Sequence, residues 1–173
     1  MITEYTKRLF RLAIDIAKAA KENRKEYFIG GGLAIDFSIG RITRNHHDID
    51  FHSMLIDAMW WKKWFEDNGY KVKGGVNPKF TEIFGIENND GETIVDMWPF
   101  KLEGEKLMIR HQGKYIDSER HWEETRGVNY EGVNIRIENP DRVLDQKLRH
   151  IKKGEKIRVQ DLHDFKLLGR KPL

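Results

Sequence analysis

Two aspartates alternate with apolar residues in the segment Asp48-Ile49-Asp50-Phe51, and this alternation constrains the fold more than any other feature of the sequence. Successive side chains of a β-strand point to opposite faces, so a strand over residues 47–52 would carry both carboxylates on one face. The apolar pair would enter the core. The two carboxylates would lie roughly 6–7 Å apart along the strand. Oxygen ligands at this spacing suit one or two Mg²⁺ ions.

A run of three glycines, Gly30-Gly31-Gly32, precedes this strand. Such a turn offers backbone N–H groups to phosphate, because no side chain covers them. A short glycine run taken alone also fits an ordinary turn. Followed by a strand with two carboxylates, it indicates metal-assisted phosphoryl or nucleotidyl transfer.

A third carboxylate, Asp96, interrupts the apolar run from Ile94 to Trp98. A buried charge is costly without a metal or an ion partner. If this run pairs beside the 47–52 strand, Asp96 completes a cluster of three carboxylates. Asp96 would then act either as the general base for an attacking hydroxyl or only as a further metal ligand.

Composition limits the class of protein. The 173 residues are 39% hydrophobic and 34% charged, which fits a folded globular chain with one core. No cysteine is present, so disulfides, thiolate nucleophiles and zinc–thiolate sites are excluded. The net charge of +3 gives little support for nucleic acid binding. Without a signal peptide or a long apolar run, a cytoplasmic protein with no membrane contact is expected. The oligomeric state is not predicted.

Periodicity and turn residues predict a single α/β domain over residues 1–173. Its core would span about 25–138, followed by a helical segment over about 139–173. Ser53 is expected to cap the third helix, and Asn139 with Pro140 to start the fourth. The predicted helices are 3–24, 33–37, 54–68, 140–153 and 159–168, and the predicted strands are 26–29, 47–52, 70–72, 80–86, 93–97, 106–110 and 133–137.

Residues 28–52 resemble the antibiotic nucleotidyltransferases, the aminoglycoside 2''-nucleotidyltransferase and lincosamide nucleotidyltransferase groups of the DNA polymerase β superfamily. The family pattern Gly-Gly-Trp-Ala-Ile-Asp, then Gly-Arg-x-Thr-Arg-x-His-x-Asp-Ile-Asp, is matched at nearly every place. Leu33 stands where the family usually has Trp. The segment Val95–Pro99 resembles the third-carboxylate segment of the family, and residues 140–168 carry a weaker resemblance.

The resemblance implies an α/β (α+β) polymerase β-like nucleotidyltransferase fold, with a small mixed sheet flanked by helices and further helices at the C-terminus. It also implies two Mg²⁺ ions and ATP as co-substrate. The implied roles are nucleotide binding for Gly31, Gly32, Arg44, His46 and Lys147, metal binding for Asp48, Asp50 and Asp96, and activation of the acceptor hydroxyl for Asp96.

The expected activity is transfer of AMP from ATP onto a hydroxyl of a small molecule, such as an aminoglycoside or lincosamide antibiotic. Two alternatives keep the same fold: a toxin-like enzyme that modifies tRNA or protein, and a non-catalytic nucleotide-binding module. A third alternative is a metal-dependent phosphohydrolase that uses His47-Asp48 with His121 and His163-Asp164. It needs its His-Asp pair on a helix, which the strand-like alternation around Asp48 disfavours. By charge pattern alone, Arg44 also fits a surface ion pair and Lys147 a solvated helix face.

Overall fold

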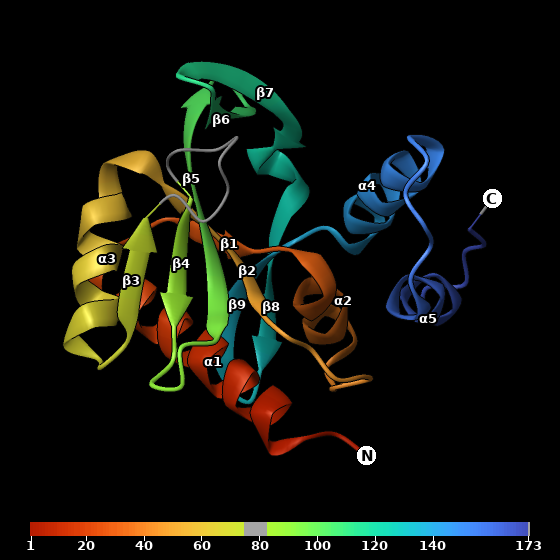
Figure 1. Ribbon diagram of the computed structural model, residues 1–173, viewed down its shortest axis with the longest axis horizontal. Helices are drawn as coiled ribbons and strands as arrows, with labels where there is room; N and C mark the ends of the chain where they lie inside the picture. The colour runs from red at the N-terminus through yellow and green to blue at the C-terminus, as the bar shows by residue number, and fades with distance from the viewer. Residues whose placement is uncertain (75–82, 173) are drawn as a thin grey trace.

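The computed structural model describes residues 1–74 and 83–172. Helices and strands alternate in the first part of the chain, a run of consecutive strands follows, and two helices come last (Figure 1). The helices are α1 (Glu4–Asn23), α2 (Gly31–Ile39), α3 (Ala58–Asp67), α4 (Pro140–Lys152) and α5 (Val159–Leu167). The strands are β1 (Tyr27–Ile29), β2 (Ile49–Met54), β3 (Lys71–Gly74), β4 (Phe84–Glu87), β5 (Thr93–Glu103), β6 (Lys106–His111), β7 (Lys114–His121), β8 (Thr125–Tyr130) and β9 (Val133–Glu138).

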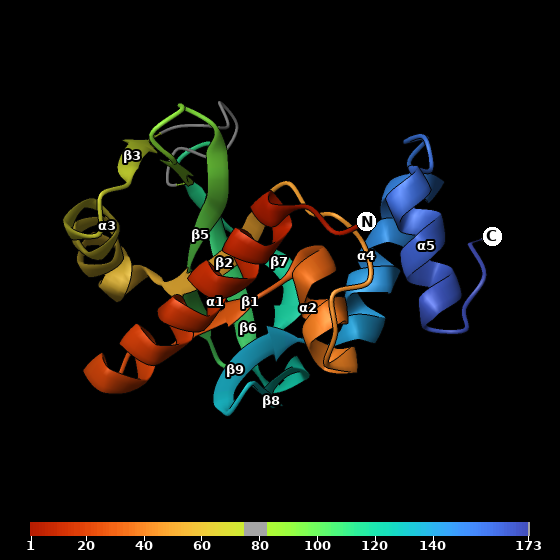
Figure 2. The ribbon, with the colours of Figure 1, turned by 90° about the horizontal axis from the view of Figure 1, so that it is seen from below.

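The sheet is mixed, as the sequence predicted. Its strand order is β3-β4-β5-β2-β1-β9-β8, and β6 and β7 extend from the second half of β5 as an arm. β2 pairs parallel with β5, and β1 pairs parallel with β9, whereas the remaining pairs are antiparallel. In both ribbon views α4 and α5 lie together at one side of the molecule, beyond α2 (Figures 1 and 2).

Alternation in β2 separates the core from the carboxylates. Ile49 and Phe51 are fully buried in the main core. The ring of Phe51 packs edge-on against Trp61 of α3, with ring centroids 4.8 Å apart. Asp50 lies between these two apolar residues and therefore belongs to the other face of the strand. On that face a smaller cluster forms around Phe28, under the β6–β7 arm.

The start of the third helix differs from the prediction. Ser53 does not cap a helix, because β2 continues through Met54 and pairs Ser53 with Tyr27 on one side and Pro99 on the other. The chain then makes a 3₁₀ turn at Leu55–Asp57 before α3 begins. Pairing with two neighbouring strands therefore outweighs the capping preference of serine.

Several strand boundaries also differ. β2 begins at Ile49 rather than at residue 47, so Asp48 precedes the strand. Of the expected strand 80–86, residues 80–82 lie outside the described residues, and β4 begins at Phe84. β7 and β8 were not predicted, because their side chains are largely polar and exposed and show no apolar alternation.

The C-terminal helices follow the prediction closely. The Asn139 side chain accepts a hydrogen bond from the Asp141 N–H, and Pro140 occupies the first turn of α4. Across residues 1–74 and 83–172, no helix has both the length and the apolar character needed to span a membrane.

Candidate active site

Strand register brings Asp50 and Asp96 together. On the parallel pair β2 and β5, Asp50 is the direct neighbour of Asp96. Adjacent strands lie about 4.8 Å apart, and side chains in register lie on the same face. Asp48 is exposed and comes two residues before Asp50, just ahead of the strand. The expectation that two neighbouring strands place Asp50 and Asp96 side by side is confirmed.

The three carboxylates interact through their charges. Burial raises the pKa of Asp50 first, and the negative charges of Asp48, Asp96 and Glu138 add to this; the pKa reaches about 7 although Arg120 opposes the change. Burial and the charge of Asp48 also raise the pKa of Asp96. Negative charge is therefore crowded at this place, and a bound cation would relieve the repulsion.

The glycine turn lies directly against Asp50. The Gly30 N–H donates to the Asp50 carbonyl oxygen at 2.8 Å. Gly31 has a φ of 59°, and a Cβ added there would lie 1.9 Å from Oδ2 of Asp50. α2 begins at this point, and its N-cap residue Gly30 contributes no side-chain hydrogen bond. The first N–H groups of α2 therefore start beside the carboxylates, where a phosphate is the natural acceptor.

Arg44 reaches the same turn but is held by an acid from α5. Its Nε and Nη2 donate to the two carboxylate oxygens of Asp164 at 2.9 and 3.0 Å. Its Nη1 donates to the Asn45 carbonyl oxygen at 3.1 Å and lies 3.2 Å from Nδ1 of His46. A Cβ added at Gly32 would lie 2.0 Å from Nη2 of Arg44, so the guanidinium covers Gly32.

His46 and Lys147 lie in the same ionic network. His46 is buried, and its Nε2 lies 2.8 Å from Oδ2 of Asp36. Because Nδ1 faces an Arg44 donor, the arrangement fits the tautomer with its proton on Nε2. Lys147 pairs with Asp161 and, at 3.3 Å, with Asp164. Both residues therefore contact other side chains of the protein rather than open solvent.

Three further residues that hydrogen-bond to one another, Arg120, Glu138 and Gln146, were missed by the sequence analysis. Arg120 at the end of β7 donates from Nε to Glu138 at 3.0 Å and from Nη2 to Gln146 at 2.7 Å. Glu138 ends β9 and is buried. No motif signals these residues, since β7 was not predicted and the three contacts connect separate elements.

The carboxylates are not arranged as a finished coordination shell. Within residues 1–74 and 83–172, no three His, Cys, Asp or Glu side chains already surround one point as metal ligands. The donor chemistry nevertheless fits a hard divalent cation, because Asp48, Asp50 and Asp96 offer only carboxylate oxygens. Their mutual repulsion is the kind that Mg²⁺ neutralises.

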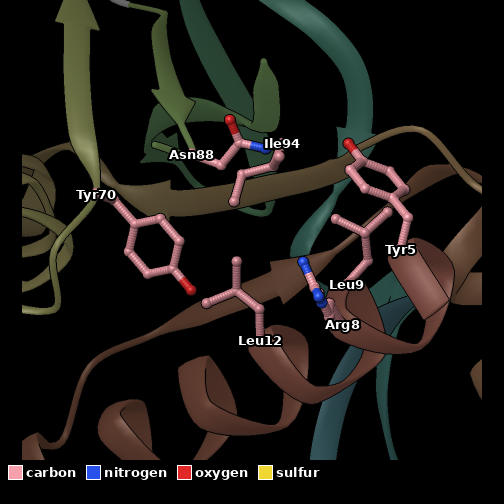
Figure 3. Close-up of a pocket in the computed structure, with 7 residues that line it drawn as sticks. All are labelled: Tyr5, Arg8, Leu9, Leu12, Tyr70, Asn88 and Ile94. Carbon is pink, nitrogen blue, oxygen red and sulfur yellow. The ribbon is translucent and has the colours of Figure 1, made fainter. Parts of the chain in front are cut away.

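A separate cavity of about 200 Å³ lies between α1 and the strand ends (Figure 3). None of the carboxylates lines it. Tyr5 connects it to the site indirectly, because the Tyr5 hydroxyl donates to the His47 carbonyl oxygen at 2.6 Å, next to Asp48. Its lining residues are Tyr5, Arg8, Leu9, Leu12, Tyr70, Asn88 and Ile94.

The sequence model of the aminoglycoside-2''-adenylyltransferases matches residues 13–168, which covers the glycine turn, all three aspartates and both C-terminal helices. The chain belongs to this adenylyltransferase family. The resemblance seen in residues 28–52 is thereby confirmed. No single curated protein sequence matches the chain significantly.

Solved structures show the fold of the adenylyltransferase family. The lincosamide antibiotic adenylyltransferase LnuA, with lincomycin bound, has a TM-score of 0.71 at 22% identity over 97% of each chain. ANT(2'')-Ia in complex with adenylyl-2''-tobramycin has a TM-score of 0.68 at 19% identity, over 94% of this chain and 87% of the other. A putative nucleotidyltransferase from Thermotoga maritima has a TM-score of 0.60 at 18% identity, over 88% and 90%. The predicted nucleotidyltransferase fold is confirmed.

Proposed function

We propose that this adenylyltransferase-family chain transfers AMP from Mg·ATP onto a hydroxyl of a small antibiotic-like acceptor. The observation that carries the proposal is the strand register that sets Asp96 beside Asp50, with the Asp50 carboxylate against Gly31 and Asp48 two residues before it. Burial, followed by neighbouring negative charge, raises the pKa of Asp50 and of Asp96, so ionised carboxylates are costly there, and a divalent cation with a triphosphate would remove that cost.

Asp48 and Asp50 would hold Mg²⁺, and Asp96 would share the metal or take the proton of the acceptor hydroxyl. When bound, the metal supplies positive charge that offsets the charge of the phosphates. The acceptor oxygen attacks the α-phosphorus of ATP, the bond to the β-phosphate oxygen breaks, and pyrophosphate leaves. The proton lost by the hydroxyl passes to a carboxylate such as Asp96.

The nucleotide phosphates would lie over Gly31 and Gly32, at the start of α2. Arg44 covers Gly32 and keeps one Nη2 donor directed away from Asp164, so it would contribute one hydrogen bond to phosphate. The proposed parts of His46 and Lys147 are indirect, because they hold Asp36, Arg44 and Asp164 in place.

Acceptor transfer is the direct test of this function. With ATP labelled on the α-phosphate, we expect Mg²⁺-dependent transfer to at least one member of a panel of aminoglycosides and lincosamides. Asp96→Asn should lower turnover by about a hundredfold or more, as expected for loss of a proton acceptor. Asp67→Asn, which changes an exposed carboxylate of α3, is the matched control and should retain activity.

The alternatives give different results in the same assay. Labelling of tRNA or protein without labelling of any antibiotic would identify a macromolecular acceptor instead. Binding of Mg·ATP without transfer to any acceptor would identify a non-catalytic module. Either result would overturn the proposed small-molecule transfer.

A further inference from the structure

Arg44, which the motif places near the triphosphate, and Lys147, for which the family resemblance implies nucleotide binding, already have partners inside the protein. A guanidinium has five N–H donors. Four of those on Arg44 are directed at Asp164, Asn45 and His46. Lys147 lies between Asp161 and Asp164. Little of their charge is therefore left for a tetra-anionic nucleotide.

Arg120 is less fully engaged. Among the described residues its guanidinium donates from Nε to Glu138 and from Nη2 to Gln146. Both N–H groups of Nη1 and one of Nη2 remain for another acceptor. The side chain is 23% exposed, so a ligand can reach it.

Arg120 also lies close to the carboxylate cluster. Its partner Glu138 touches the glycine turn, because a Cβ added at Gly30 would lie 3.0 Å from Oε2 of Glu138. The Gly30 N–H in turn donates to the Asp50 carbonyl oxygen at 2.8 Å. Arg120 is thus a cation beside both the carboxylates and the start of α2.

The carboxylate that holds Arg120 is buried. Glu138 is 3% exposed, and its Oε1 accepts from Arg120 and from Gln146 of α4. Its Oε2 is buried without a hydrogen-bond partner among the described residues. The chain thus buries a carboxylate whose hydrogen bonds fix one guanidinium. Such a fixed fork loses little conformational entropy on binding, and its planar geometry matches phosphate oxygens.

We propose that Arg120 binds a phosphate oxygen of the nucleotide, with Glu138 and Gln146 as the positioning residues that hold its guanidinium beside Asp50. The inference rests on the proposed function, since it names a binding residue for the same site. It places the main cation for the triphosphate on the end of β7, outside every motif of the sequence.

Calorimetric titration of Mg·ATP tests the proposal without needing an acceptor. Arg120→Gln should weaken the Kd for Mg·ATP at least tenfold, as expected for loss of a charge-assisted hydrogen bond. The KM for the acceptor should not change. Arg149→Gln is the matched control, because Arg149 also links α4 to β7, through Glu119, and should bind Mg·ATP as the wild type does.

A second variant covers the case in which Arg120→Gln fails to fold. Gln146→Ala keeps Arg120 and Glu138 but removes one of the two anchors, so it should raise the KM for ATP about threefold with little change in kcat. An unchanged Kd in Arg120→Gln, or an equal weakening in Arg149→Gln, would overturn the assignment. If the wild type binds Mg·ATP but modifies no acceptor, the proposed function fails. The Kd values of the wild type, Arg120→Gln and Arg149→Gln for Mg·ATP would still decide whether Arg120 binds the nucleotide.

Discussion

Gly31 combines a positive φ with a side-chain position that the Asp50 carboxylate already occupies. An alanine there would carry backbone strain of about 1–2 kcal/mol and would also displace the carboxylate. Gly40 has a φ of 77° but nothing within 4 Å of an added Cβ, so it isolates the backbone strain. Comparing the alanine variants of these two glycines therefore separates the cost of backbone strain from the effect of moving the Asp50 carboxylate.

We predict that Gly40→Ala loses about 1–2 kcal/mol of stability in denaturant unfolding and that Gly31→Ala loses at least as much, because it also displaces the Asp50 carboxylate. Only Gly31→Ala should lose transfer activity, by about a hundredfold or more, because it moves Asp50, a proposed metal ligand, out of place. Full activity in Gly31→Ala would show that the contact with Asp50 does not matter for the reaction.

Asp161 makes stability depend on pH. Its burial acts to raise the pKa, but hydrogen bonds from Arg158 and Lys147 outweigh burial and hold the pKa well below its ordinary value. A lowered pKa in the folded state stabilises the protein fully above the ordinary aspartate pKa of about 4. That contribution is lost as the pH falls below this value.

We therefore predict that Asp161→Asn lowers the Tm at pH 7 and that the difference from the wild type shrinks as the pH falls from about 5 to 3. Thermal unfolding at a series of pH values measures this. A difference that stays constant down to pH 3 would mean that Asp161 acts by packing rather than by charge.

The sequence identified the acidic residues of the proposed site better than it identified which side chains pair with one another. Asp48, Asp50 and Asp96 stand out because each interrupts or alternates with apolar residues. Arg44 was placed near the glycine turn by its motif, and it does cover Gly32. Its partner Asp164 is 120 positions later, and no local pattern connects the two.

Among the elements, α5 is joined to the loop before β2 by two consecutive contacts. His163 lies 3.0 Å from the Thr43 hydroxyl, and the next residue, Asp164, pairs with Arg44. The His163-Asp164 pair lies on a helix, as a His-Asp phosphohydrolase would need, but both residues contact the loop here. Because Arg44 covers Gly32, this contact links α5 to the glycine turn.

For this reason, removing the Asp164 carboxylate should strongly destabilise the fold. Asp164→Ala leaves Arg44 without its buried counter-charge and leaves Lys147 with Asp161 alone, and we predict a loss of about 3–5 kcal/mol in the free energy of unfolding. Asp15→Ala, which breaks a solvent-exposed pair with Lys18, should change it by less than about 0.5 kcal/mol. Comparable losses in the two variants would argue against a stabilising role for the network.

Elements with strong apolar periodicity were predictable, and those held by tertiary contacts were not. The helix at residues 4–23 and the capped helix after Asn139 follow directly from local sequence. β7 and β8 form because they pair with β6 and β9, and their polar sequences do not predict strands by themselves. Arg120, the proposed phosphate-binding residue, lies on β7, one of these unpredicted strands.

For the whole molecule, the proposed site combines residues of the sheet, the glycine turn and the C-terminal helix α4. β2 and β5 supply the acids, α2 supplies N–H groups, and β7 with β9 and α4 supplies the Arg120 cluster. The acids and the glycine turn were predicted from the local sequence, through the alternation around Asp50, the apolar run around Asp96 and the run of three glycines. The Arg120 cluster depends on how the arm returns to the sheet, which only the folded chain reveals.

Binding of a divalent ion by the carboxylates tests the account most directly. Titration of Mn²⁺ in the presence of a non-hydrolysable ATP analogue, followed by electron paramagnetic resonance, reports bound metal without turnover. We predict that the wild type binds Mn²⁺ and that Asp50→Asn weakens this binding by about tenfold or more, whereas Asp67→Asn does not. Equal Mn²⁺ affinity in the wild type and in Asp50→Asn would contradict the proposed metal site.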